Sequence, residues 1–202
     1  GKRYRLGPQI LTLAGRYLAG LDIAQMGKPI VRRLMIETGE STELAARRGE
    51  KIQIVCKEDC SSTIQRVIEL GDRAPIYATA AGKSILAHLS DEEIDEYLSS
   101  VELKAITKKT ITDKKVLRCQ LHEIRSGATA YSHEELNEGL VAMAAPVFNL
   151  NGNVVASIVV PIPILRFTKE KERAIALALR KSAETLSHQL GFTGDSRARA
   201  AG

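Results

Sequence analysis

The segment Gly139–Pro163, GLVAMAAPVFNLNGNVVASIVVPIP, decides the fold of this chain. Its two apolar runs are separated by Asn149–Asn153, and the Asn-Gly step in that stretch is typical of a hairpin turn. The second run, Val154–Val160, is rich in β-branched residues and carries no charge, which predicts a strand buried on both faces. Such a strand needs layers of structure above and below it. The segment therefore predicts a central hairpin that helices cover.

The composition is that of a globular protein. Hydrophobic residues make up 44% of the 202 residues and charged residues 26%, enough for a sizeable core. No apolar run approaches the roughly 20 residues of a membrane span, and no signal peptide is found. Aromatic residues reach only 4%, which argues against a stacking surface for single-stranded nucleic acid. The net charge of +5 suits an anionic small molecule or a polyanion nearby, although scattered Lys and Arg would also produce it.

The cysteines favour a reduced, cytoplasmic protein. Cys56, Cys60 and Cys119 are odd in number and have no disulfide framework spacing. Cys56 and Cys60 could form half a metal site, but two unpaired thiols at a strand end is the favoured interpretation. Because the sequence contains no His-x-x-x-His or Cys-x-x-Cys pair, we expect neither a metal nor a cofactor.

The first part of the chain changes from helical to strand periodicity. Apolar residues at helical spacing predict an amphipathic helix over 6–21 that must cover its own domain or a partner chain. A second helix over 22–38 comes next, kinked or beginning at Pro29. Alternating residues then predict a hairpin over 42–56 and a third strand over 63–70. Residues 71–75 have the composition of a loop.

The second part of the chain is predicted to contain both helices and strands. We expect helices over 78–89, from a capping box at 90–93 to about 99, from 113 to 127, and over 168–190. Basic residues 104–115 predict a solvated loop, and 128–132 a strand before the central hairpin. Residues 193–202 have no reason to order. Since most connections are hairpins, the prediction is an α/β fold with a mainly antiparallel sheet covered by helices.

The sequence contains no convincing catalytic motif. Ala81–Ser84 matches only the end of a phosphate loop, because Tyr77 stands where that loop needs a glycine. His133, Glu134 and Glu135 could form an acid–base set, but nothing marks a nucleophile or a second carboxylate partner, and a solvated turn is the favoured interpretation. We therefore expect a binding module rather than an enzyme, with no catalytic residues.

Small residues at 78–82 stand where a helix is predicted to begin. Free backbone N–H groups and the helix dipole attract an anion at such a position. Close packing of the helix on the sheet would favour the same small residues, so both interpretations stay open.

Two motifs together resemble IclR-type bacterial transcription regulators. Arg73–Ala87, RAPIYATAAGKSILA, resembles the family's segment R-x-P-x-x-A-T-A-x-G-K-A-x-L-A. Glu134–Leu140, EELNEGL, leads to Ala144–Phe148, AAPVF, as in the family. Residues 4–7 look like the exit from the family's DNA-binding wing, and 6–21 look like its linker helix.

The resemblance extends to about Phe192 and implies a domain organisation. Residues 1–5 would be the remnant of the wing, 6–21 the linker helix and 22–192 a GAF-like effector-binding domain, with a disordered tail over 193–202. The family's winged helix is not in this chain, so DNA would be bound only through that missing domain. The resemblance also implies a homodimer or homotetramer and no membrane association.

The family's effector pocket lies between the sheet and the loop that begins the helix at Ala80. By resemblance, the backbone of Ala80 and Ala81 would meet the effector's carboxylate. The other implied lining residues are Ala74, Leu140 and Ala142 at the side, Thr63 and Arg66 near the mouth, and Ser132, Val159 and Pro161. Ser132 stands where many members have an acidic residue, and Val159 and Pro161 where members that bind very small polar acids carry hydroxyl groups.

These departures make the expected pocket less polar. A two- or three-carbon keto acid would leave its polar groups unpaired against Val159, so a longer or aromatic carboxylic acid is expected. The alternative is a stand-alone metabolite sensor or an enzyme of the same fold that uses His133 and Glu134.

Overall fold

The computed structural model describes residues 23–62 and 68–194. The predicted wing remnant over 1–5, the linker helix over 6–21, and the tail beyond residue 194 lie outside the described residues. Two of the expected effector-site residues, Thr63 and Arg66, also lie outside them.

The strands form one antiparallel sheet of six, in the order β3-β2-β1-β6-β5-β4. In chain order they are β1 (Thr42–Arg48), β2 (Lys51–Glu58), β3 (Arg73–Pro75), β4 (Ala130–His133), β5 (Leu140–Phe148) and β6 (Val154–Pro163). The predicted central hairpin is confirmed as β5 and β6, which pair from Leu140–Pro163 to Phe148–Val154. Asn149 closes its turn, because its Oδ1 accepts the N–H groups of Asn151 and Asn153, each at 3.0 Å.

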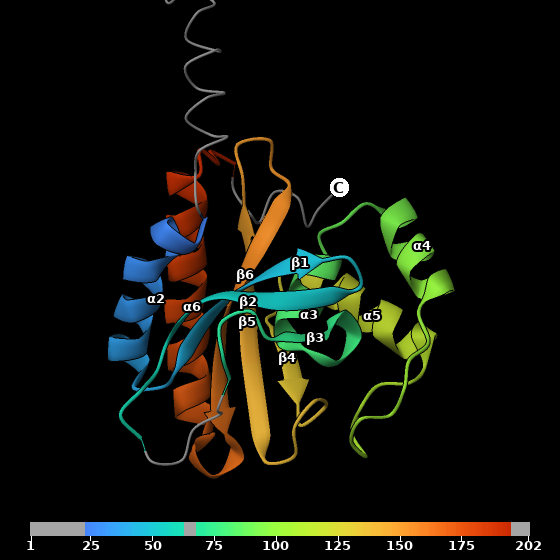
Figure 1. Cartoon of the computed structure of the whole chain (residues 1–202), viewed down its shortest axis with the longest axis horizontal. Helices are drawn as coiled ribbons and strands as arrows, with labels where there is room; N and C mark the ends of the chain where they lie inside the picture. The colour runs from blue at the N-terminus through green and yellow to red at the C-terminus, as the bar shows by residue number, and fades with distance from the viewer. Residues whose placement is uncertain (1–22, 63–67, 195–202) are drawn as a thin grey trace, which may run out of the picture.

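Helices cover both faces of the sheet, as Figure 1 shows. On one face lie α2 (Ile23–Thr38) and α6 (Lys169–Gln189), and on the other α3 (Ala80–Leu86), α5 (Lys114–Arg125) and, further out, α4 (Asp91–Ser100). Because side chains alternate along β5, successive residues of this strand pack into the core on opposite faces of the sheet. Met143 and Val147 pack with α2 and α6, whereas Ala142 and Ala144 pack with α3 and α5.

Most predicted helix boundaries are confirmed. The capping box is present at α4, where Ser90 Oγ accepts the Glu93 N–H and the Glu93 carboxylate accepts the Ser90 N–H. Asp113 caps α5 through the Lys115 N–H at 2.7 Å. The second predicted helix is one continuous helix, α2, that contains Pro29 and does not begin there.

The predicted third strand over 63–70 is wrong for its described residues, and residues 63–67 lie outside the described ranges. Residues 68–70 are not in a strand, and the stretch expected to be a loop contains β3, at Arg73–Pro75. The turn before it docks on β2, since Gly71 N–H donates to Ile54 O at 2.9 Å and Ile54 N–H donates to Asp72 O at 3.0 Å. A three-residue edge strand tolerates Pro75 because its outer side needs no N–H donor. The composition of residues 71–75 is that of a loop, and for this reason the sequence did not predict the edge strand β3.

Candidate functional site

The start of α3 is built from a 3-10 turn over Ile76–Ala78 and a capping threonine. Thr79 Oγ1 accepts the Gly82 N–H, and Thr79 O accepts the Lys83 N–H, both at 3.0 Å. The predicted helix over 78–89 therefore begins later, at Ala80, because Thr79 is its cap. The amides of Ala80 and Ala81 come before the first amides with an acceptor in their own helix, as at every helix start. They are the donors that an anion would use.

Gly82 explains how closely this helix packs. A Cβ atom at residue 82 would lie 2.2 Å from Ile76 O and 2.5 Å from Ile76 Cα, both backbone atoms that cannot move aside. Close packing thus accounts for the glycine itself. Ala80 and Ala81 are also buried, at 1% and 2% exposure, so the anion hypothesis depends on their amides at the helix start and not on the size of their side chains.

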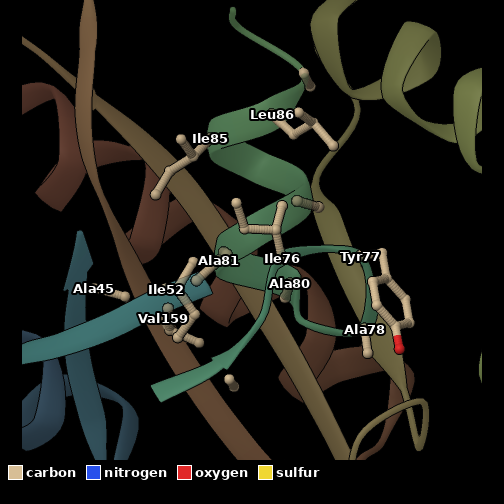
Figure 2. Close-up of a cluster of buried hydrophobic side chains, with 14 of the residues drawn as sticks. Ala45, Ile52, Ile76, Tyr77, Ala78, Ala80, Ala81, Ile85, Leu86 and Val159 are labelled. Carbon is tan, nitrogen blue, oxygen red and sulfur yellow. The ribbon is translucent and has the colours of Figure 1, made fainter. Parts of the chain in front are cut away.

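The described residues of the expected site gather on one face of the sheet. Ala80 and Ala81 are buried in one cluster with Ala74, Ala142 and Val159. Figure 2 shows Ala81 and Val159 within this cluster, the first on α3 and the second on the strand behind it. The side chains of these five residues are all apolar, as expected for a surface that contacts the body of an organic acid.

Ser132 and Pro161 flank Ala142 in the sheet. Both are in register with Ala142, Ser132 on β4 and Pro161 on β6. The hydroxyl of Ser132 is buried and donates to Ala78 O at 3.1 Å, so β4 is tied directly to the turn that precedes α3. Leu140, two residues before Ala142 on the same face, is half-buried.

A buried ion pair that the sequence did not predict lies beside this site. The Lys83 ammonium contacts both carboxylate oxygens of Glu135, at 2.7 and 2.9 Å, and Gln120 Oε1 at 3.0 Å. Lys83 is 1% exposed and Glu135 4%. Burial lowers the pKa of Lys83, and the negative charge of Glu135 opposes that shift. The pair joins α3 and α5 to the loop that leads into β5.

The prediction of a solvated turn at His133–Glu135 is therefore wrong for Glu135. The neighbouring loop is folded against it as well, since Thr110 Oγ1 donates to Glu135 O at 2.6 Å and Thr107 Oγ1 to Glu134 O at 2.7 Å. Residues 104–115, predicted to be a solvated loop, thus include two threonines that bind the acidic segment. In the described chain, Glu134 is the non-glycine residue with positive φ, at 58°.

His133 and Glu134 are not arranged as an acid–base set. The Glu134 carboxylate forms an ion pair with Lys109 and accepts the Gly139 N–H at 2.8 Å, and these contacts lower its pKa. The exposed His133 ring stacks on Tyr131 with centroids 5.1 Å apart. Glu134 therefore serves to close its own loop.

A second buried carboxylate, Glu40, lies just before β1. Glu40, 1% exposed, binds Arg166 through both oxygens, at 2.9 and 2.5 Å, and forms an ion pair with Lys171. Burial alone would raise the pKa of Glu40, but the hydrogen bonds and charges of the two cations outweigh it and lower that pKa. This cluster joins the end of α2 to the start of α6.

Metal-ligating side chains do not gather in the described ranges, where no three His, Cys, Asp or Glu residues are grouped to hold an ion. Within the same ranges Cys56, Cys60 and Cys119 form no disulfide. None of the helices described is long and apolar enough to cross a membrane.

A family model described as "Bacterial transcriptional regulator IclR C-terminal" matches residues 15–188 of the chain. This chain belongs to the IclR family. It is the effector-binding C-terminal domain of an IclR-family transcriptional regulator, as its sequence motifs predict.

Relatives and solved structures agree with this assignment. The chain is 30% identical over 189 residues to the HTH-type transcriptional repressor AllR of Klebsiella pneumoniae, covering 94% of this chain and 70% of AllR. It is 31% identical over 191 residues to the regulator KdgR of Escherichia coli K12, covering 95% of this chain and 73% of KdgR. These relatives are transcription regulators, not enzymes.

The fold is also that of solved IclR proteins. The crystal structure of Thermotoga maritima IclR matches with a TM-score of 0.82 and 32% identity, over 92% of this chain and 75% of that one. The C-terminal domain of Escherichia coli KdgR matches with a TM-score of 0.77 and 31% identity, over 85% of this chain and all (100%) of that domain. The predicted GAF-like antiparallel sheet is thereby confirmed.

Proposed function

We propose that this IclR domain senses a small monocarboxylic acid with an apolar or aromatic body. The carboxylate would bind the amides of Ala80 and Ala81, and the body would lie against Ala142 and Val159. The observation that carries the proposal is the start of α3, where two helix amides stand over an apolar sheet face. Ala74, Ser132, Leu140 and Pro161 would complete the lining, with Thr63 and Arg66 at the mouth.

The energetic argument favours an apolar body. The helix dipole contributes about 0.3–1 kcal/mol to binding of an anion. Each additional buried CH₂ contributes about 0.8 kcal/mol, which is roughly fourfold in affinity. Val159, Ala142 and Leu140 offer no side-chain hydrogen bonds, so a very small polar acid would gain little from them.

We also propose that effector binding controls DNA binding through the family's winged helix, and that the protein acts in the cytoplasm as a homodimer or homotetramer. The relatives' names, which are those of helix-turn-helix regulators, support the first part. The apolar stripe over 6–21, proposed as a linker helix, supports the second, because such a stripe is poorly soluble when exposed. Light scattering that found only monomer at micromolar concentration would contradict it.

Calorimetry with matched acids tests the effector class. We expect wild type to bind benzoates more tightly than glyoxylate or pyruvate, and to bind each acid more tightly than its primary amide. Val159→Ser should weaken this preference and make the small acids competitive. A wild-type protein that prefers glyoxylate to every benzoate would refute the proposed pocket while leaving the family assignment intact.

We propose no catalytic turnover. His133→Ala should leave any bound acid chemically unchanged, as in wild type, because Glu134 is engaged with Lys109 and Gly139. Mass spectrometry that detected a product after incubation would favour an enzyme instead.

A further inference from the structure

A cleft of about 690 Å³ lies at the β4 side of the sheet and contains none of the residues proposed for the effector site. Its walls are the end of α5 with the loop after it, the last part of β5, and α6. Its volume falls within the range of about 300–1,000 Å³ that small-molecule sites occupy. The cleft reaches His88, just beyond α3, and Ala144, which is in register with Val159.

One wall of the cleft is aromatic. The ring of Phe148 lies edge-on to His88 and tilted against Phe192, with centroids 5.2 Å apart in both pairs. Phe148 and Phe192 are two of the three phenylalanines in the chain, so this wall concentrates a scarce residue type. Ala144, Pro146 and Ala183 extend the apolar surface. Such a wall favours a flat ring.

The sheet edge in the cleft is unsuited to an added strand. β4 pairs with β5 only from Val141 to Ala144. The next residues whose backbone faces that side are Pro146 and Phe148, because backbone direction alternates along a strand. Pro146 has no N–H, and the Phe148 N–H already donates to Ser187 Oγ at 3.0 Å. An extended peptide would therefore find no donors there.

One exposed arginine at the mouth, Arg180, can bind an anion. Arg125 is occupied, since it donates to Ala87 O and Leu89 O and forms an ion pair with Asp91, each at 2.7 Å. Arg180 is exposed, and in the described chain its hydrogen bond is a single long one, 3.5 Å, to Gly127 O. Glu184, one turn further along α6, forms no ion pair with it within the described ranges.

We propose that this cleft is a second ligand site, for an aromatic carboxylate whose ring packs on Phe148 and whose carboxylate binds Arg180. The proposal does not depend on the effector site at α3. A ligand there would touch His88 and Ala144, the points at which the cleft adjoins α3 and the effector face of the sheet.

The test compares 2-naphthoate with uncharged 2-naphthamide by calorimetry on the whole chain. We expect the acid to bind more tightly than the amide, and Arg180→Gln to lower the affinity for the acid about three- to fivefold, the upper part of the range for an exposed ion pair. Lys181→Gln removes the same charge from the adjacent, exposed position outside the cleft and should change affinity less than about twofold. Ala176→Tyr, which fills the cleft from a half-buried position, should abolish the part of the binding that Arg180→Gln weakens.

Three outcomes would overturn the proposal. The first is the absence of 2-naphthoate binding to wild type up to about 1 mM. The second is that Val159→Ser weakens binding of 2-naphthoate while Arg180→Gln and Ala176→Tyr do not change it. This result would place 2-naphthoate in the effector site. The third is loss of self-association in Ala176→Tyr with naphthoate binding unchanged, which would make the cleft a contact between copies of the chain.

Discussion

Breaking the Lys83–Glu135 pair should be among the most destabilising single changes in this domain. Glu135→Met leaves an ammonium that is 1% exposed without its counterion. Removal of one partner of a buried pair costs about 3–5 kcal/mol. At a urea slope of about 2 kcal/mol/M, a loss of about 3 kcal/mol lowers the unfolding midpoint by about 1.5 M. Lys83→Met should cost a similar amount, because it leaves the carboxylate unpaired.

The double variant Lys83→Met/Glu135→Met separates charge from packing. Two apolar side chains of similar length remove both buried charges, so the double variant should be more stable than either single one. It should still fall below wild type by about 1–2 kcal/mol, because Gln120 Oε1 and the His133 N–H lose their hydrogen-bond partners. Urea unfolding followed by circular dichroism measures all three. Single-variant losses under about 1 kcal/mol, or losses that add in the double variant, would refute the reasoning.

Three further predictions concern stability. Gly82→Ala should cost about 3 kcal/mol or prevent folding, because its methyl group would meet the Ile76 backbone; normal thermal unfolding of this variant would contradict the contact. The free energy of unfolding should fall as the pH drops below 4.5, the ordinary pKa of a glutamate, because the pKa of Glu40 is lowered in the folded state and its contribution is lost when it is protonated. In Glu40→Gln, the free energy of unfolding should depend less on pH in this acid range. Ser90→Ala removes the cap of α4 and should cost about 1 kcal/mol in urea unfolding, and a loss below about 0.3 kcal/mol would contradict the capping role.

The sequence predicted the elements whose cause is local. Val154–Val160 forms a central strand because its β-branched residues need burial on both faces. Helix α4 begins directly after Ser90 because the four consecutive residues 90–93 contain its complete capping box. β3 escaped prediction because it exists only through its pairing with Lys51–Gln53 on β2. Edge strands of three residues have no periodicity of their own to detect.

The site was predictable only in part, and for a similar reason. The motif around Ala80 indicated a candidate site on one face of the sheet, and the structure brings Ala80, Ala142 and Val159 together there. The partnership of Lys83 with Glu135 spans 52 residues of sequence, and both side chains belong to types that usually face water. The charges of Lys83 and Glu135 alone predict that both side chains face solvent. They are buried only because they pair with each other in the folded structure.

The contact between Gly82 and Ile76 limits how this domain can respond to a ligand. The space between the two backbones is too small for even a Cβ atom, so we expect the first turn of α3 and Ile76 to move together. Ile76 comes directly after β3, without an intervening residue. We therefore expect a ligand that displaces the first turn of α3 to displace β3 as well, and the resulting motion to be measurable at the β2–β3 edge of the sheet.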